Sequence, residues 1–357
     1  MMEQSGLLTE KKTDIKSLTL PELTAEMEAM GEKKFRAGQL YQWMHQKLAG
    51  DYEEMTNIPA ALKEKCRERF TYTSLVCVRE QISKIDGTRK YLFGLSDGNV
   101  VESVFMRYKH GNSVCISSQV GCRMGCRFCA STLDGLERNL LPSEMLDQIY
   151  AITRITGERV SNVVVMGTGE PLDNYDNVVR FLQNVNHQKG MNIGYRHISL
   201  STCGLVDKID RLAEEEFPIT LSVSLHAPND LIRNMIMPVN KKYNVDSLIE
   251  CCRRYIAKTG RRISFEYILI DGVNDSERCA AELAKLTRGM LCHINLIPAN
   301  FVPESGFSSS SRKNVRAFVS ALEALRVNVT VRRTLGADIE ASCGQLRRNE
   351  MNSRTKR

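Results

Sequence analysis

Long hydrophobic runs are missing from this chain of 357 residues. No stretch approaches the roughly 20 consecutive apolar residues that a membrane-spanning helix needs, which argues against a membrane protein. The N-terminal stretch MMEQSGLLTEKKTDIK carries charges of both signs and lacks the apolar core of a secretory signal. Low-complexity segments and internal repeats are also absent, apart from the alternation described below. We therefore expect a globular protein of the cytoplasm that does not associate with membranes.

Cysteine, by contrast, is abundant, with 12 residues. Because no export signal is recognisable, a disulfide scaffold is an unfavourable interpretation of these residues. When a protein of a reducing compartment has many cysteines, their thiols more often bind metal or take part in chemistry than form disulfides. Their spacing is therefore more informative than their number.

The net charge is mildly positive, at +7, and is unevenly spread. Residues 347–357 form a basic C-terminal tail, in which a single Glu350 stands against Arg347, Arg348, Arg354, Lys356 and Arg357. Such a tail favours a polyanionic partner, because cations that bind phosphates release counterions. A frayed, solubilising terminus is an equally good interpretation.

Two regions with different patterns open the chain. Residues 1–70 place apolar residues at helical spacing, as in FRAGQLYQWMHQKL, and predict a small N-terminal helical domain. Residues 71–110 alternate apolar and polar residues and contain Asp86-Gly87 and Asp97-Gly98, which are hairpin signals. We interpret this second region as a small β extension that leads into the main domain.

In residues 111–346, short apolar strands alternate with amphipathic helices. Strands are expected near 114–118 and at 162–166, 197–201, 219–225, 263–270, 292–297 and 327–333. Helices are expected at 143–156, 174–187, 205–215, 245–257, 275–287 and 312–326. This order predicts an α/β fold in which six βα units form a parallel sheet that curls into a full or partial barrel. The active site of such a barrel lies at the carboxyl ends of its strands.

The segment SQVGCRMGCRFCA, residues 118–130, carries the strongest chemical signal. Cys122, Cys126 and Cys129 have the spacing CxxxCxxC on one tight loop after the first barrel strand. Three thiolates can hold three irons of a [4Fe–4S] cluster and leave the fourth iron open to a small molecule. Gly121 and Gly125 permit the bent backbone that such a loop needs. A zinc knuckle and a chance spacing are the alternatives, although zinc usually takes paired CxxC units or added histidines.

CxxxCxxC with an aromatic residue before the last cysteine, here Phe128, resembles the signature of the radical S-adenosylmethionine (SAM) superfamily. Longer strings resemble one branch, the RlmN family of RNA methyltransferases that convert adenosine to 2-methyladenosine. They are ESVFMRYKHGNSVCISSQVGCRMGCRFCAST (102–132), VVVMGTGEPLDN (163–174), ISLSTCG (198–204), SVSLHAPND (222–230), GVNDS (272–276), NLIPAN (295–300) and DIEASCGQL (338–346). The resemblance covers about residues 30 to 346 and implies a radical SAM partial (β/α)6 TIM-like barrel.

The resemblance also implies a set of SAM-binding residues. Glu170 lies in the GEP segment that contacts the amino group of SAM in the family, and the other positions hold its carboxylate and nucleoside. The matching residues here are Gly169, Glu170, Ser201, Ser224, Leu225, His226 and Asn300. They follow or end predicted strands, where short polar groups suit a zwitterionic ligand. Taken singly, each residue has an ordinary structural interpretation as a turn, cap or strand-end residue.

In the family, two further cysteines and two SAM molecules solve the problem that carbon 2 of adenine is not a nucleophile. The matching residues are Cys343, which would accept a methyl group, and Cys115, which would release the product through a transient disulfide. Glu102 matches the family's proposed proton acceptor. A lone cysteine is usually a small hydrophobic residue, so these roles depend on the resemblance alone.

The resemblance implies RNA partners, namely 23S ribosomal RNA and the adenosine next to the anticodon of some transfer RNAs. It also implies an electron donor such as flavodoxin or ferredoxin, and we expect a monomer. The nearest alternative is a Cfr-type enzyme, which methylates carbon 8 of the same adenine. That branch has GEA where this chain has GEP at 169–171, and a cysteine where it has Val120. A non-catalytic iron–sulfur RNA-binding protein is the alternative from another class.

Overall fold

A mixed ten-stranded sheet is the centre of the molecule, which we describe from a computed structural model covering residues 12–298 and 306–339. The strand order is β1-β2-β3-β4-β7-β8-β9-β10-β11-β12. Seven strands are parallel: β4 (Gly111–Cys115), β7 (Val160–Val165), β8 (Ile198–Thr202), β9 (Thr220–Ser224), β10 (Ile263–Leu269), β11 (Cys292–Pro298) and β12 (Val329–Val331). This confirms the predicted βα series, including its last strand.

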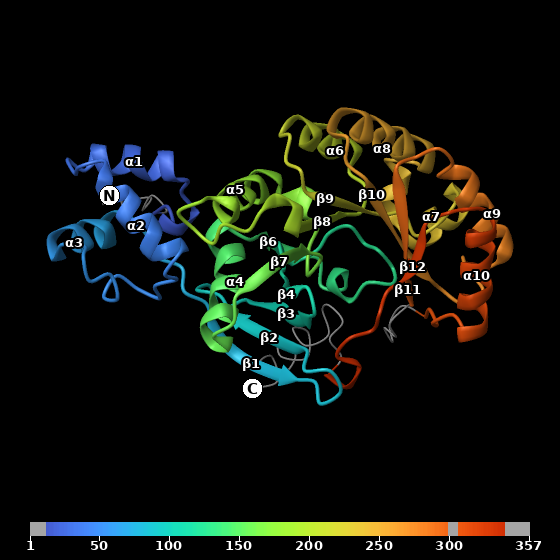
Figure 1. The fold of residues 1–357 in the computed structure, drawn as a ribbon, viewed down its shortest axis with the longest axis horizontal. Helices are drawn as coiled ribbons and strands as arrows, with labels where there is room; N and C mark the ends of the chain where they lie inside the picture. Colours follow the sequence, from blue (N-terminus) through green and yellow to red (C-terminus); the bar gives the residue numbers. More distant parts are fainter. Residues whose placement is uncertain (1–11, 299–305, 340–357) are drawn as a thin grey trace, which may run out of the picture.

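Helices form an arc along one side of this sheet, as Figure 1 shows. They are α4 (Pro142–Thr156), α5 (Tyr175–Asn186), α6 (Val206–Glu214), α7 (Asp230–Ile236), α8 (Val245–Thr259), α9 (Glu277–Leu286) and α10 (Arg312–Ala324). The sequence analysis did not predict α7, a seven-residue helix between β9 and α8. In the described part of the chain, no helix combines the length and the apolar character needed to cross a membrane.

The predicted β extension is present and is continuous with the barrel. Strands β1 (Val76–Ile82), β2 (Arg89–Gly94) and β3 (Val100–Tyr108) pair antiparallel, and β3 then pairs antiparallel with β4. Gly87 and Gly98 adopt positive φ angles of 74° and 86° in the two turns, as the hairpin signals indicated. The extension therefore lengthens the main sheet instead of forming a sheet of its own.

Alternation along the strands separates two faces of the sheet. Val114, Val163 and Val165 are buried in the main hydrophobic core, so their side chains face the helices. Cys115 follows Val114 and therefore points to the opposite, inner face. In the register of β3 and β4, Cys115 pairs with Val104, which places Glu102 on that same inner face.

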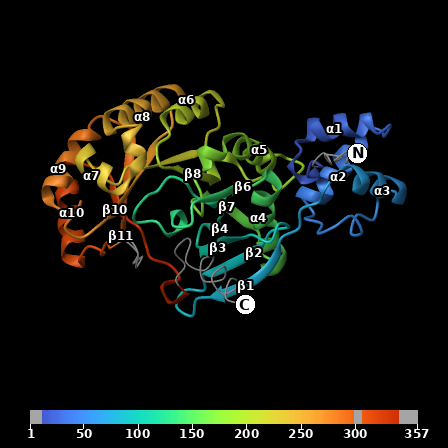
Figure 2. The same ribbon diagram turned by 180° about the vertical axis from the view of Figure 1, so that it is seen from behind.

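The N-terminal helices α1 (Leu20–Ala29), α2 (Phe35–His45) and α3 (Ala60–Arg69) pack around a hydrophobic cluster of their own. In Figure 2 they lie at one end of the molecule, with α9 and α10 at the other. Polar contacts fix this N-terminal region to the barrel. Lys16, in the turn before α1, has its Nζ atom 3.0 Å from the Asp147 carboxylate, and both side chains are fully buried. The His45 Nδ1 atom lies 2.7 Å from the Tyr150 hydroxyl on α4.

After β12, residues 332–339 form a segment that we call the strap. It begins beside β11, where the Arg332 backbone donates to the Leu296 carbonyl at 2.8 Å. It ends at the β1–β2 turn, where Asp338 hydrogen-bonds Ser83 and Lys84, as can be followed in red in Figure 1. The strap thus connects the β12 edge of the ten-stranded sheet to its β1 edge. The sequence analysis predicted neither of these two contacts.

Candidate active site

One cavity, of about 150 Å³, lies at the carboxyl ends of β7, β8 and β9. Its lining residues come from the cysteine loop and from the ends of these strands: Cys122, Met124, Cys126, Phe128, Cys129, Thr132, Val165, Met166, Gly167, Gly169, Glu170, Pro171, Ser201, Thr202, Cys203, Ser224, His226 and Met237. The three cysteines therefore share a cavity with five of the residues singled out from the sequence. The Leu225 side chain instead packs in the main core. Asn300, Cys343 and the tail 347–357 lie outside the described residues.

A two-stranded hairpin that the sequence analysis missed brackets the cysteine loop. Strands β5 (Gln119–Gly121) and β6 (Leu136–Asn139) pair antiparallel on either side of it. The Cys122 backbone donates to the Gly135 carbonyl at 2.8 Å. Gly121 has a φ of 76°, and a Cβ there would lie 2.0 Å from that same carbonyl oxygen, so no side chain fits. The hairpin thus fixes the point where the loop begins.

The environment of the thiols fits a polynuclear cluster. Met124, Phe128 and Met237 belong to an apolar cluster that also contains Cys126. Burial raises the pKa of the Cys122 thiol to about 12, and the neighbouring Cys129 thiolate adds to this shift. A bound cation would reverse this effect, because coordination deprotonates a thiol.

The donors of this cavity include three thiols, which suit soft metals. In the described ranges, no group of three or more His, Cys, Asp or Glu side chains is arranged to hold one ion. A [4Fe–4S] cluster makes a different demand, because each thiolate binds its own iron. The three cysteines line one cavity, as the ligands of such a cluster would.

Glu170 is held rigidly at the wall of the cavity and is 3% exposed. Its Oε1 atom accepts from the Leu172 backbone at 3.0 Å, and Oε2 accepts from the Cys203 backbone at 2.7 Å. Burial raises the pKa of this carboxyl, and the two backbone hydrogen bonds counteract the shift. The Thr202 and Cys203 side chains also lower this pKa as hydrogen-bond partners. A carboxylate at the cavity wall is a group that can accept from a cationic amino group. Gly169 has a φ of 110°, and a Cβ there would lie 2.6 Å from the Gln119 side chain.

His226 is fixed as a neutral imidazole. Its Nδ1 atom accepts from the Ile268 backbone at 3.0 Å, which leaves the hydrogen on Nε2. Burial lowers the pKa of the ring to about 3, and the charge of Arg233 adds to this shift. The ring also meets Phe128 of the cysteine loop edge to face, with 4.9 Å between the ring centres. Its backbone φ of 57° shows that the chain turns sharply here.

Glu102 and Cys115 share the inner face of the sheet, and neither of them lines this cavity. The Glu102 carboxylate is 4% exposed and lies 3.1 Å from the Nζ atom of Lys90, which is fully buried. The sequence analysis missed Lys90, since only the register of β2 and β3 brings it near Glu102. A buried carboxylate needs such a partner, because an unpaired charge is costly to bury.

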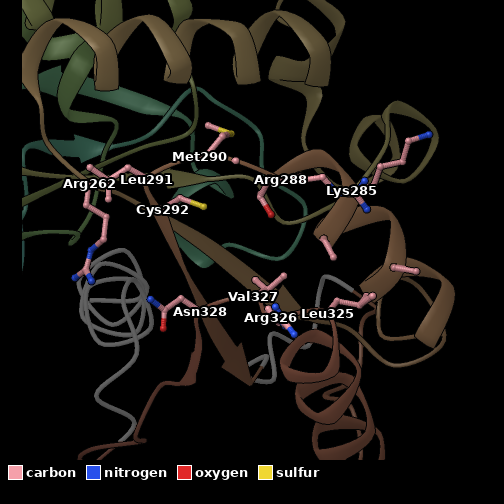
Figure 3. A pocket seen from close by; sticks show the side chains of 14 residues that line it. Arg262, Lys285, Arg288, Met290, Leu291, Cys292, Leu325, Arg326, Val327 and Asn328 are labelled. Carbon is pink, nitrogen blue, oxygen red and sulfur yellow. The ribbon is translucent and has the colours of Figure 1, made fainter.

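A second cavity, of about 770 Å³, lies at the amino ends of β10, β11 and β12 and is shown in Figure 3. Four basic residues line it, and no acidic residue does: Arg262, Lys285, Arg288 and Arg326. It lies at the opposite ends of the strands from the cysteine loop. Barrel enzymes place their chemistry at the carboxyl ends, so the first cavity is the candidate active site.

Comparison with known proteins gives matches along nearly the whole chain. Residues 116–283 match the Radical SAM superfamily, and residues 13–71 match the ribosomal RNA large subunit methyltransferase N-terminal domain. A probable dual-specificity RNA methyltransferase RlmN of Lachnospira eligens is 59% identical, with 95% of this chain and 97% of that protein covered. Its counterpart in Lachnoclostridium phytofermentans is 56% identical, with 95% of each chain covered.

A solved structure agrees with these matches. The crystal structure of a radical SAM methyltransferase from Sphaerobacter thermophilus is 45% identical and superposes with a TM-score of 0.89. The alignment covers 93% of this chain and 98% of that one. Because a relative 59% identical matches 95% of the chain and the Radical SAM model matches residues 116–283, the chain belongs to the RlmN family of radical SAM enzymes.

Proposed function

We propose that this protein methylates carbon 2 of an adenosine in 23S ribosomal RNA and of the adenosine next to the anticodon in transfer RNA. One observation carries the proposal. The three loop cysteines line one cavity together with Gly169, Glu170, Ser201, Ser224 and His226. An electron carrier or a plain RNA-binding protein would not need polar residues from three strand ends beside its cysteines.

Cys122, Cys126 and Cys129 are the residues that would hold a [4Fe–4S] cluster, with one iron left for the amino and carboxylate groups of SAM. When bound, the cluster supplies the electron that cleaves SAM reductively. Glu170 would accept a hydrogen bond from the SAM amino group, and the neutral His226 presents its Nε2 hydrogen as a donor. The apolar side chains around the loop exclude water from this chemistry.

Cys343 would act first: its thiolate would attack the methyl carbon of one SAM, gain the methyl group and release S-adenosylhomocysteine. A second SAM would be cleaved reductively to methionine, and its deoxyadenosyl part would take one hydrogen from this S-methyl group and leave as 5′-deoxyadenosine. The resulting carbon radical would add to carbon 2. After an electron and the carbon 2 proton are lost, the Cys115 thiolate attacks the Cys343 sulfur. This attack breaks the bond between sulfur and the added carbon, which takes up a proton to become the methyl group of the product, and the two cysteines remain joined in a disulfide.

Glu102 is the proposed acceptor of the carbon 2 proton. Its carboxylate shares the inner face of the sheet with Cys115, which supports a common task for the two residues. The ion pair with Lys90 fixes the position of the carboxylate. Proton transfer depends on such positioning before it depends on acidity.

The proposal extends to the organisation and partners of the chain. We assign residues 1–70 to a helical accessory domain, 71–110 to the β extension, 111–346 to the catalytic domain and 347–357 to a basic tail. The tail and the helical domain would contact RNA phosphates, and flavodoxin or ferredoxin would supply electrons. Two SAM molecules are consumed per methylation, and the protein acts as a cytoplasmic monomer.

Nucleoside mass spectrometry tests the reaction. The protein is reconstituted with iron and sulfide without oxygen, then incubated with SAM, a reductant and each RNA. We expect 2-methyladenosine in both RNAs, and 8-methyladenosine would assign the chain to the Cfr-type branch. Absence of SAM cleavage in the reduced, iron-loaded protein would support the non-catalytic alternative.

Replacing the loop cysteines singly with alanine tests the cluster. Each variant should lose the brown chromophore and SAM cleavage, because three thiolates are the minimum donor set for this cluster. Cys77→Ala, which changes an exposed thiol on β1, is the matched control and should keep both. Full zinc occupancy without iron after anaerobic purification would contradict the assignment.

A further inference from the structure

Arg233, on α7, is fully buried and does not line the cavity. All five N–H groups of its guanidinium donate hydrogen bonds to oxygen atoms within 3.2 Å. The acceptors are the carbonyls of Cys203, Ser224, Leu225 and Tyr243 and the Oδ1 atom of Asn240. A buried guanidinium normally needs a carboxylate partner, because burying a charge is costly. Here all five acceptors are neutral, so the charge itself is not neutralised by a hydrogen-bond partner.

Three of these acceptors lie at the ends of the strands that form the active-site wall. The Cys203 carbonyl follows β8, and the Ser224 and Leu225 carbonyls lie at the end of β9. The two strands pair only as far as Thr202 and Val223. Beyond that point, Arg233 takes the place of the backbone hydrogen bonds and joins the two strand ends.

The same helix also contacts the cysteine loop. The Arg127 backbone, between two loop cysteines, donates to the Ile236 carbonyl at the end of α7 at 2.9 Å. Burial lowers the pKa of the Arg233 guanidinium, and the nearby Cys203 and Cys126 thiols act in the opposite direction. An arginine stays protonated even so. Arg233 binds the Cys203 carbonyl at 2.8 Å, and Cys203 lines the cavity together with the three loop cysteines. A permanent positive charge therefore lies directly behind the cavity wall.

We propose that Arg233 is the fixed counter-charge of the iron–sulfur centre and at the same time the residue that positions the ends of β8 and β9. This inference rests on the cluster assigned in the proposed function. Three thiolates give such a centre a negative charge, and reduction by one electron adds to it. Net charge and nearby hydrogen bonds set the reduction potential of these clusters. A buried cation favours the reduced form and so raises the potential, with little screening by water.

Two substitutions of Arg233 separate charge from geometry. Arg233→Lys keeps the charge and loses part of the hydrogen bonding, whereas Arg233→Gln loses the charge as well. The midpoint potential of the reconstituted cluster is measured by redox titration with electron paramagnetic resonance, without SAM present. We expect a potential near that of the unchanged protein in Arg233→Lys and a more negative one in Arg233→Gln. Both variants should bind SAM more weakly, because both release the strand ends.

A second site keeps the test decisive if Arg233→Gln does not fold. Asp230 accepts hydrogen bonds from Asn240 Nδ2 and from the Val245 backbone, both at 2.8 Å through Oδ1. Asp230→Asn keeps that oxygen and removes a negative charge near Arg233, so its cluster potential should shift in the positive direction. Equal potentials in Arg233→Gln and Arg233→Lys, or a negative shift in Asp230→Asn, would overturn the inference. An unchanged protein that binds no iron would instead refute the proposed function.

Discussion

Asp338 lies 255 positions after Ser83, yet its carboxylate accepts a hydrogen bond of 2.6 Å from the Ser83 hydroxyl. The Lys84 backbone donates to the same carboxylate at 2.8 Å, and the Gly336 backbone donates to Asp86 at 2.9 Å. Asp338 of the strap and Asp86 of the β1–β2 turn therefore hold these two segments together. This contact fixes the position of Gly336 and Asp338, which precede Cys343 by a few residues in the sequence.

Removing this contact should free the strap without unfolding the barrel. In Asp338→Ala we expect faster hydrogen exchange of the amides in residues 332–339, because two of the hydrogen bonds that hold this segment are lost. Exchange in the barrel strands should stay as it was. Asp51→Ala, which removes a local acceptor in the N-terminal domain, is the control and should leave the strap unchanged.

Acid should have the same effect on the strap. The hydrogen bond from Ser83 lowers the pKa of Asp338. Burial acts to raise the pKa of Asp86, but hydrogen bonds from the Gly336 and Thr88 backbones outweigh it and lower the pKa to about 2. Carboxyls with lowered pKa values stabilise the fold above their ordinary range, and this contribution is lost as pH falls below about 4. Exchange in the strap that is independent of pH, after correction for intrinsic rates, would contradict this expectation.

Two glycines at the ends of the cysteine loop provide a matched pair of variants. Gly121 and Gly135 have similar φ angles, 76° and 70°, but a Cβ at Gly135 would meet nothing within 4 Å. Gly135→Ala should cost about 1–2 kcal/mol, the penalty of a left-handed conformation. Gly121→Ala should cost clearly more and reduce iron binding, because the Gly135 carbonyl would have to move. Thermal unfolding of the apoprotein and iron content after reconstitution measure both effects, and equal results would contradict the steric argument.

His45 should make the stability of the protein depend on pH. Burial lowers the pKa of this imidazole to about 3, and the charges of Lys16 and His187 add to the shift. The unfolded chain takes up a proton at about pH 6.5, and the folded protein does not. The stability contribution is therefore complete above about pH 6.5 and falls with pH by up to about 1.4 kcal/mol per unit.

His45→Gln is the variant that checks this dependence. It should be less stable at neutral pH, because the packing against Tyr150 changes. Its free energy of unfolding should nevertheless fall less steeply between pH 6.5 and 4 than that of the unchanged protein. Urea unfolding at several pH values measures the slope. Parallel curves for the two proteins would show that His45 does not carry this pH dependence.

Cys115 and Cys343 should fail in different ways when replaced. Cys343→Ala should bind its cluster and transfer no methyl group to RNA. Cys115→Ala should still add to the base, and the intermediate should then persist as a covalent protein–RNA adduct, because no thiol remains to release it. A slowly migrating band on a denaturing gel detects the adduct. Normal turnover of Cys115→Ala, or equal crosslinking by both variants, would refute the assigned roles.

Local patterns in the sequence were sufficient for the main βα series and for the three clustered cysteines, although they missed α7 and the β5–β6 hairpin. Apolar periodicity follows from which face of an element is buried, and each element carries that signal within its own residues. The same holds for CxxxCxxC, since Cys122, Cys126 and Cys129 lie within one loop. Turn glycines such as Gly87 and Gly98 were also predictable, because a positive φ is a local requirement.

The tertiary structure alone decided which distant residues meet. Lys90 approaches Glu102 only through the register of β2 and β3, and Arg233 reaches the ends of β8 and β9 only through the placement of α7. Leu225 stands between two residues of the cavity wall, yet its side chain enters the core. Register, burial of a charge and the direction of a side chain at a strand end depend on contacts between segments far apart in the chain. No local pattern encodes these features, because their interaction energies depend on residues that only the folded chain brings close together.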